Sequence, residues 1–458
     1  MMDVIVILWT DALVFLLVFA VIVLALKLRQ SRQFVEQWHS VFKTKVGAST
    51  AIILLAYIVV GLMDSAHYHP SQISDSGVST PSAQVISVLD YTLSGLKNST
   101  EKSYSAPFAQ TLYVKENIQI NNVLQRGYPP LEKRALHLSA DEPVLFDALA
   151  KGVIGALLGM AVMLVLIFAI GKVNSKGLSG MFLPSSHIQW RSISITLLSI
   201  GAFMGSMLYL SSYYHVLGTD KVGQDVLYLS LKSIRTGLVI GTLTTLIMLP
   251  IAIMLGIMAG FYRTWIDDII QYIYTTLNSI PGILLIAASV LMLQVFMDNN
   301  PDMFSTVEER SDARLFFLCL ILGMTSWTGL CRLLRGETLK IRELDFIQAA
   351  KALGSSNMTI IRRHILPNLM HIVLISIVLD FSALVLAEAV LAYVGIGVDP
   401  TMNSWGNMIN SARLEMSREP IVWWSLLAAF WFMFVLVLAA NLFSDAIRDA
   451  FDPKLRSR

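Results

Sequence analysis

The sequence predicts an all-α polytopic membrane protein, and two properties support this prediction. Hydrophobic residues make up 55% of the 458 residues and charged residues only 14%, with a mean hydropathy of +0.64. This is more apolar material than a soluble core of the same size needs. Apolar runs of about 20 residues, the length of a membrane-spanning helix, recur along the chain. A net charge of +2 gives no reason to expect nucleic-acid binding, so membrane lipid is the expected surrounding.

By this length rule the chain contains nine candidate spans, of which the second is the least secure. The first run is too long for the apolar part of a signal peptide and no basic segment precedes it, so we do not expect a cleaved leader. The nine candidates are residues 4–26, 46–63, 148–171, 193–214, 234–260, 269–297, 315–334, 369–396 and 422–443.

Lys and Arg residues indicate the orientation of the spans, because they collect in cytoplasmic loops. With nine spans, the main basic clusters all fall on one side if the N-terminus is outside and the C-terminus is cytoplasmic. The densest cluster follows the seventh span and consists of Arg332, Arg335, Lys340, Arg342, Lys351, Arg362 and Arg363.

Composition divides the chain into four regions. Residues 1–63 hold two N-terminal spans, and residues 64–147 form either a small extracytoplasmic domain or a partly ordered loop, two alternatives that the sequence leaves open. Residues 148–185 hold a third span and a Gly/Ser-rich cytoplasmic linker. Residues 186–458 contain the remaining six spans. The first three regions together are called the N-terminal extension below.

A cytoplasmic elbow is predicted at residues 344–368, LDFIQAAKALGSSNMTIIRRHILPN. Gly354 stands where a first helix ends in the left-handed conformation, and a second helix is expected to start near Met358 and to stop before Pro367. The elbow has no pair of carboxylates and no nucleophile beside a base, so it is a docking site for a soluble partner rather than a catalytic site. The predicted apolar stripe is Leu344, Ile347, Ala350, Ala352 and Leu353, and the candidate N-cap residues are Ser355, Ser356 and Asn357.

A second motif, HVLGTDKVGQDVLYLSLKSIRTG, follows the fourth span at residues 215–237. Gly218 and Gly223 punctuate it, while Asp220 and Asp225 suit turns and helix starts. We interpret it as a structured outer turn that lays a short helix along the membrane surface, in preference to a binding site.

Polar and helix-breaking residues inside the spans are the candidates for a translocation pathway. Pro281 should kink or break the sixth span, either for a pathway or for packing alone. Asp380 and Glu388 lie in the eighth span, where carboxylates are costly. We expect Glu388 to have a structural role and Asp380, nearer the middle, to face a polar pore. Cys319 and Cys331 are interpreted as buried and reduced.

Motifs for chemistry are lacking in the sequence. It contains no GxxxxGK[ST], HExxH or GxSxG pattern, so we expect no catalytic residues, no metal site and no cofactor in this chain. If ATP powers transport here, the ATPase is another chain.

Residues 348–368, QAAKALGSSNMTIIRRHILPN, resemble the EAA loop of binding-protein-dependent ABC importer permeases. HVLGTDKVGQDV, WID, LAEAVLAYVGIG, SWGNM and NLFSDAIRDAFDP, in this order, are similar to the C-type subunit of the dipeptide/oligopeptide/nickel permease subfamily. The resemblance covers roughly residues 192–458. The N-terminal extension has no counterpart in the usual pattern of that family.

The resemblance implies a type I ABC importer transmembrane domain in a bacterial inner membrane, moving di- or oligopeptides by alternating access. Its partners would be a B-type permease, two ATPase subunits carrying ATP and Mg, and an extracytoplasmic solute-binding protein. Alternatives are import of nickel or another small solute, or a non-transporting membrane scaffold. By position, the coupling loop would include Gln348, Ala349, Ala350, Gly354, His364 and Pro367, with Gln348 replacing the usual glutamate, and the outer loop motif would include Gly218, Thr219, Asp220, Gly223 and Asp225.

Overall fold

The computed structural model describes residues 4–30, 32–73, 79–81, 85–120, 123–135, 144–173, 188–304 and 306–451. Within these residues nine helices are long and apolar enough to cross a membrane, which confirms the predicted polytopic all-α class. The chain divides into two compact units, each built from separate stretches of sequence. Unit 1 is Met1–Ile7, Trp38–Gly237 and Met402–Ala439, and unit 2 is Leu8–Gln37, Leu238–Thr401 and Ala440–Arg458.

Unit 1 combines most of the N-terminal extension with parts of the six-span region. Its long helices are α3 (Lys45–Ser65), α6 (Val144–Val173) and α8 (Trp190–Ser211), and it also holds α16 (Trp405–Glu415). Two helices have their first parts in it and continue into unit 2, α9 (Val226–Tyr262) and α17 (Trp424–Phe451). Helix α2 (Arg32–Lys43) also crosses from one unit to the other.

Short elements of unit 1 follow α3 and fill much of the described part of residues 64–147. Two small helices, α4 (Val88–Thr92) and α5 (Ser94–Lys97), bury Leu89 and Leu96. One three-stranded sheet has the order β1-β2-β5, and β3–β4 and β6–β7 form antiparallel pairs. The strands are β1 (Val4–Val6), β2 (His67–His69), β3 (Ser71–Ile73), β4 (Ser79–Pro81), β5 (Ile86–Ser87), β6 (Glu116–Ile120) and β7 (Val123–Gly127).

Unit 2 holds the elbow and the helices that carry it. Its long helices include α1 (Trp9–Leu28), α12 (Val307–Arg342) and α15 (Leu366–Tyr393). A core of buried apolar side chains, among them Trp327, Ile347 and Ile365, joins α9, α12, α15 and the elbow. The other elements are α10 (Trp265–Ser279), α11 (Gly282–Asn299), η1 (Pro301–Met303), α13 (Asp345–Ala352), α14 (Asn357–Ile360) and η2 (Ile361–Ile365).

Several predicted spans have limits that differ from those of the helices, among them the span at 315–334, which is part of the longer α12. The run at 4–26 does not start as a helix, because β1 pairs with β2 through Val4 and His69, and α1 begins only at Trp9. The run at 269–297 is two helices, since α10 ends at Ser279 and Pro281, which lacks an amide donor, precedes α11. The break expected at Pro281 is therefore confirmed, and only α11 is apolar and long enough to span.

A further correction concerns the motif at 215–237. Along these residues, all of which the structure describes, α9 begins at Val226 and continues without a separate surface helix. The observed helix is therefore longer at both ends than the predicted span at 234–260. The Asp225 side chain accepts a hydrogen bond from the Leu227 amide at 2.9 Å, which caps the start of α9 earlier than the apolar pattern suggests.

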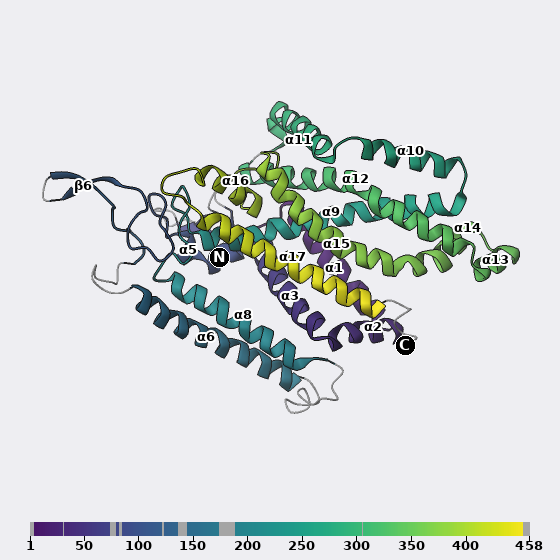
Figure 1. Ribbon diagram of the computed structural model, residues 1–458, viewed down its shortest axis with the longest axis horizontal. Coiled ribbons are helices and arrows are strands. Elements are labelled where there is room, and N and C mark those ends of the chain that lie inside the picture. Colours follow the sequence, from purple (N-terminus) through teal and green to yellow (C-terminus); the bar gives the residue numbers. More distant parts are fainter. Residues whose placement is uncertain are drawn as a thin grey trace. The chain divides into compact units, whose positions relative to one another are not determined.

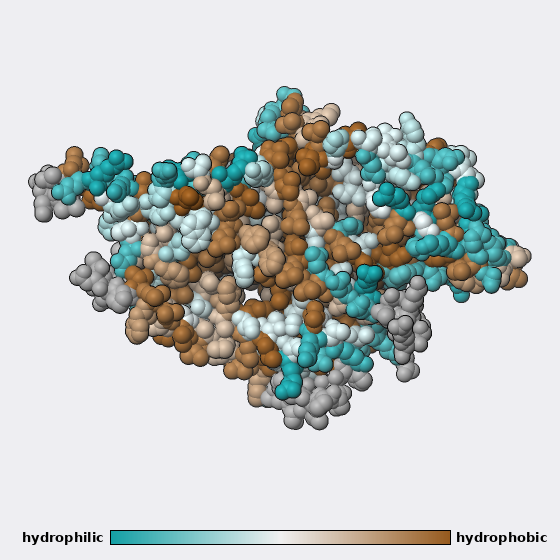
Figure 2. Space-filling view, viewed as in Figure 1, coloured by the Kyte–Doolittle hydropathy of each residue, from teal (hydrophilic) through white to brown (hydrophobic). Residues whose placement is uncertain are grey.

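Apolar side chains cover large parts of the helix surfaces, as Figure 2 shows in brown. On α6 alone Leu157, Leu158, Val162, Val165 and Phe168 are exposed. In water such a surface would be unfavourable, but it is the surface that contact with lipid hydrocarbon requires.

Glycines allow α6 and α8 to approach closely (Figure 1). A Cβ atom added to Gly159 would lie 1.9 Å from the carbonyl oxygen of Gly201, and one added to Gly155 would lie 2.6 Å from that of Gly205. Small residues of this kind let helix backbones pack tightly within membranes. The third span of the N-terminal extension is thereby packed against the first span of the six-span region.

We predict that Gly159→Ala lowers the melting temperature of the purified protein. The added methyl group has no room beside Gly201, so the helices must separate, and overpacking of this kind costs about 1–3 kcal/mol. Gly329→Ala in α12 is the matched control, because a Cβ atom there meets nothing within 4 Å. Thermal unfolding in detergent measures both variants, and equal melting temperatures would contradict the close packing.

Candidate functional site

The turn of the elbow has the local structure that the sequence predicts. Gly354 has a φ of +77°, and the amides of Gly354 and Ser355 donate to the carbonyl oxygens of Lys351 and Ala350 at 2.9 and 3.1 Å. This pair of bonds closes the end of α13 as a Schellman motif. Ser356 is the N-cap of α14, since its Oγ accepts a hydrogen bond from the Thr359 amide at 3.3 Å.

The second helix of the elbow does not stop before Pro367, so this prediction is wrong. Helix α14 continues through η2, a π-helical turn, into α15, whose first turn contains the proline. In that turn the Leu366 amide donates to the carbonyl oxygen of Ile361, five residues back. Because Pro367 has no amide proton, the regular helical hydrogen bonding is interrupted there, and the π-helical turn lies directly before this interruption.

The predicted apolar stripe of the elbow divides into a buried and an exposed part. Ile347 and Ala350 pack into the core of unit 2, whereas Leu344 is about half exposed and Leu353 is 85% exposed. Ala352 is exposed as well. Only part of the predicted stripe is therefore covered by the core. We define the apolar tip of the elbow as the three exposed side chains Phe346, Leu353 and Met358.

Of the six predicted coupling residues, Gln348 makes the clearest contact. Its side-chain amide donates to the carbonyl oxygen of Arg342 at 3.1 Å, which ties α13 to the last turn of α12. The His364 ring lies 6.2 Å from the Phe346 ring, between centroids. Ala349 and Pro367 are exposed, while Ala350 is buried.

An ion pair that sequence reasoning missed supports the elbow from α10. The Arg335 guanidinium on α12 binds Asp267 through two hydrogen bonds, Nε to Oδ1 at 2.6 Å and Nη2 to Oδ2 at 2.8 Å. Bonds from Arg335 hold the pKa of Asp267 below its usual value. Asp267 belongs to the WID motif quoted above, but its partner is 68 residues away, and nothing in the local pattern identifies it.

The end of α9 makes further contacts with the elbow and its approach. Arg342 donates through Nη1 to the carbonyl oxygen of Phe261 at 2.6 Å, and the Lys351 ammonium lies 5.3 Å from the centroid of the Phe261 ring. Arg263 pairs with Glu343 at 3.2 Å on the exposed side. Since α9, α10 and α12 all hold it, the elbow moves with these helices and is not a flexible loop.

The two carboxylates of the eighth span have different surroundings. Glu388 is buried on α15, and its structural role stays a prediction. Asp380 is partly exposed and makes no hydrogen bond or ion pair with the residues that the structure describes. Its role in a pore stays a prediction. Cys319 and Cys331 are free and buried, as predicted.

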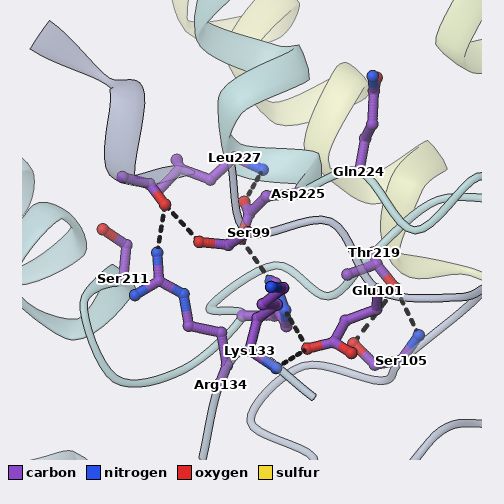
Figure 3. Close-up of polar contacts among 12 residues, drawn as sticks. Ser99, Glu101, Ser105, Lys133, Arg134, Ser211, Thr219, Gln224, Asp225 and Leu227 are labelled. Atoms are coloured by element: carbon purple, nitrogen blue, oxygen red, sulfur yellow. Dashed lines mark hydrogen bonds and ion pairs between the residues drawn. The ribbon is translucent and has the colours of Figure 1, made fainter. Parts of the chain in front are cut away.

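Residues 215–225, called the return loop below, pack against residues of the N-terminal extension. Gly218 and Gly223 have φ values of +72° and +76°, and a Cβ atom on Gly223 would lie 1.8 Å from the carbonyl oxygen of Glu101. Thr219 accepts a hydrogen bond from the Ser105 amide at 2.6 Å, and Trp424 donates to the Thr219 carbonyl oxygen at 2.9 Å. Figure 3 shows Thr219 beside Ser105 and Glu101.

His215 lies at the centre of this contact and is fully buried. Its Nδ1 is 2.7 Å from Asp225 and its Nε2 is 3.5 Å from Glu101. Burial alone would lower the pKa of His215, but the hydrogen bonds and charges of the two carboxylates outweigh it and raise the pKa. Glu101 also accepts bonds from the Glu132 and Lys133 amides, both at 2.9 Å.

The return loop is thus an internal scaffold, in keeping with the preference for a structured turn over a binding site. Asp220 accepts hydrogen bonds from the amides of Val222 and Gln224 and so shapes the loop itself. Sequence reasoning missed Glu101, Ser105 and Lys133, which lie about 100 residues away and carry no motif.

A polytopic helical membrane protein with a firmly mounted, exposed elbow has the architecture of the membrane-spanning part of a transport system. The chain belongs to the family of binding-protein-dependent transport system inner membrane components, whose family model matches residues 252–457. It is therefore a multi-span permease component of an ABC transport system.

Two relatives and one solved structure are similar to this chain. The glutathione transport system permease protein GsiD of Pectobacterium atrosepticum is 33% identical over 244 residues, which cover 53% of this chain and 74% of that protein. The oligopeptide transport system permease protein OppC of Mycobacterium bovis is 31% identical over 243 residues, covering 53% of this chain and 77% of that protein. A chain of the inward-facing MetNI methionine ABC transporter aligns at 15% identity with a TM-score of 0.38, covering 49% of this chain and 98% of that one.

We predict that Asp267→Asn weakens the mounting of the elbow. The asparagine can accept only part of the bidentate bond and leaves the Arg335 charge unbalanced, at a cost of about 1–3 kcal/mol. Arg310 and Asp298 form an exposed pair, and Asp298→Asn is the control because such pairs contribute little. Hydrogen exchange should quicken at residues 344–353 in Asp267→Asn alone. Unchanged exchange there would contradict the supporting role of the ion pair.

We also predict that the stability of the protein falls as the pH rises above neutrality. A group with a raised pKa in the folded state contributes stability that is fully present below its unfolded pKa, about 6.5 for histidine. For His215 this contribution is lost between that pH and its raised folded pKa. Melting temperatures from pH 6 to pH 9 should fall in the parent protein and fall less in His215→Gln. Identical slopes in the two proteins would refute the assignment.

Proposed function

We propose that this chain is a permease subunit of an ATP-driven importer that moves di- or oligopeptides across the bacterial cytoplasmic membrane by alternating access. The observation that carries the proposal is the elbow, a rigidly mounted helical turn with an exposed apolar tip. Family membership and the similarity to permeases named for glutathione and oligopeptide transport support it.

The apolar tip, Phe346, Leu353 and Met358, is the surface offered to a soluble ATPase subunit. Exposed large apolar side chains grouped at one place are typical of a docking site. Two ATPase subunits would bring ATP and Mg, one for this chain and one for a homologous B-type permease. Because the elbow is fixed to α9, α10 and α12, closure of the ATPases would move these helices and switch the access of the pathway.

This arrangement requires the elbow and the C-terminus to be cytoplasmic and the N-terminus to be outside. The distribution of Lys and Arg supports this orientation. An extracytoplasmic solute-binding protein would then deliver cargo on the side of the return loop and the N-terminal extension.

Growth and uptake measurements test which solute the importer carries. Cells that depend on this importer should grow on peptides as their sole amino-acid source, and deletion of the chain should abolish that growth. An importer for nickel, the alternative, would instead show metal uptake that peptides do not compete for. Growth on peptides unaffected by the deletion would overturn the peptide assignment.

A non-transporting membrane scaffold is the alternative from another class, and the N-terminal extension motivates it. A scaffold requires no ATPase, whereas the importer requires one at the elbow. Purification of the tagged chain from native membranes separates the two, since only the importer should retain an ATPase subunit, and Leu353→Asp should release it.

We predict that Gly354→Val abolishes uptake while membrane insertion stays intact. A β-branched residue is strained at a φ of +77°, so the turn between α13 and α14 must change shape. Gly354→Asn is the matched control, because asparagine tolerates the left-handed conformation and should retain uptake. Uptake of labelled peptide and the membrane content of each variant are the measurements. Normal uptake by Gly354→Val would argue against the elbow as the coupling element.

A further inference from the structure

A lysine near the start of α9 is held by carboxylates of the N-terminal extension. Lys232 makes an ion pair with Asp90 of α4, and its Nζ lies 3.7 Å from Asp64 at the end of α3. The side chain of Lys232 is 18% exposed, and those of both carboxylates are 4% exposed. All three residues lie within unit 1. They are called the ion cluster below.

Several hydrogen bonds hold both the backbone amide and the carboxylate of Asp90. Its backbone amide donates to Ser87 Oγ at 3.0 Å, and its carboxylate faces the Ser87 amide at 3.4 Å, which together make a capping box for α4. The carboxylate also accepts from Tyr228 at 2.8 Å and pairs with Lys97 at 3.1 Å. Burial alone would raise the pKa of Asp90, but Lys232, Tyr228 and Lys97 together lower it to about 2.

Asp64 is fixed from the same side. Ser87 Oγ donates to Asp64 at 2.7 Å, and the Val88 amide donates to the Ala66 carbonyl oxygen at 2.9 Å. These bonds join the end of α3 to the start of α4. Both carboxylates therefore reach Lys232 from a connected part of the extension.

The free-energy cost of burying a charge without a partner explains why Lys232 needs the two carboxylates. An ammonium group taken out of water without a partner is strongly unfavourable, whereas a neutral, well-packed replacement of a whole pair is often tolerated. Lys232 lies in the six-span region, but the two carboxylates that pair with it belong to the N-terminal extension and precede the lysine by about 140 residues or more. Without the extension, Lys232 would lose both of these partners.

We propose that Asp64 and Asp90 are built-in counter-ions that position Lys232 and fix the first turns of α9 to the N-terminal extension. The extension is then a structural part of the permease rather than an accessory domain. Any opening motion that displaces this end of α9 must carry the extension with it or separate the ion cluster.

Asp90→Asn in the full-length protein tests the proposal. It should lower the melting temperature by roughly 5 °C or more, because it leaves a buried lysine with one weaker partner. Hydrogen exchange should quicken at residues 226–236, the first turns of α9. The triple variant Asp64→Asn/Asp90→Asn/Lys232→Met removes the lysine charge together with both of its partners and should recover most of both losses.

Lys102→Met is the matched control. Lys102 pairs with Glu132 at 3.6 Å in the same region, but both side chains are about 60% exposed, so its loss should change neither readout. The proposal is overturned if Asp90→Asn behaves like Lys102→Met, or if the triple variant is no more stable than Asp90→Asn alone. If Asp90→Asn does not accumulate, Asp64→Asn replaces it, with a smaller loss expected from its longer contact, and an unchanged melting temperature there overturns the proposal as well.

Discussion

A buried charge in a chain with so much apolar surface is costly unless an opposite charge lies beside it. In this protein several of the important pairs join parts of the chain that are distant in sequence. Arg335 and Asp267 hold the base of the elbow, and His215 lies between Asp225 and Glu101 in the return loop. Pairing of charges therefore sets the positions of the regions on which the proposed transport cycle depends.

Neighbouring residues form the turn of the elbow, whereas residues that are distant in sequence hold its orientation. Its turn needs only Gly354 and Ser356, whose caps form from neighbouring atoms. Its orientation needs Phe261, Asp267 and Arg342, which belong to the approaching helices. Gln348 connects the two, because its amide group donates to the Arg342 carbonyl oxygen, a bond that a glutamate carboxylate in its ionised form could not donate. The irregular residue of the motif thus gains a contact within the chain while losing a charge.

Features governed by short-range rules could be predicted from the sequence. The number of spans, the left-handed Gly354 and the break at Pro281 all follow from length, capping and proline geometry. The continuation of the elbow helix past Pro367 could not, since it depends on a π-helical turn that has no composition signal. Neither could the contacts of Glu101 with the return loop, or the exposure of Leu353, because both depend on which distant surface covers the residue.

Helices α6 and α8 lie side by side, and glycines make their contact tight. During synthesis this pair can form as soon as the second helix enters the membrane, without waiting for α9 or anything after it. This helix pair, together with Asp64 and Asp90, would then be in place before Lys232 is synthesised. The third span of the extension would thus assist biogenesis first and belong to the finished transporter afterwards.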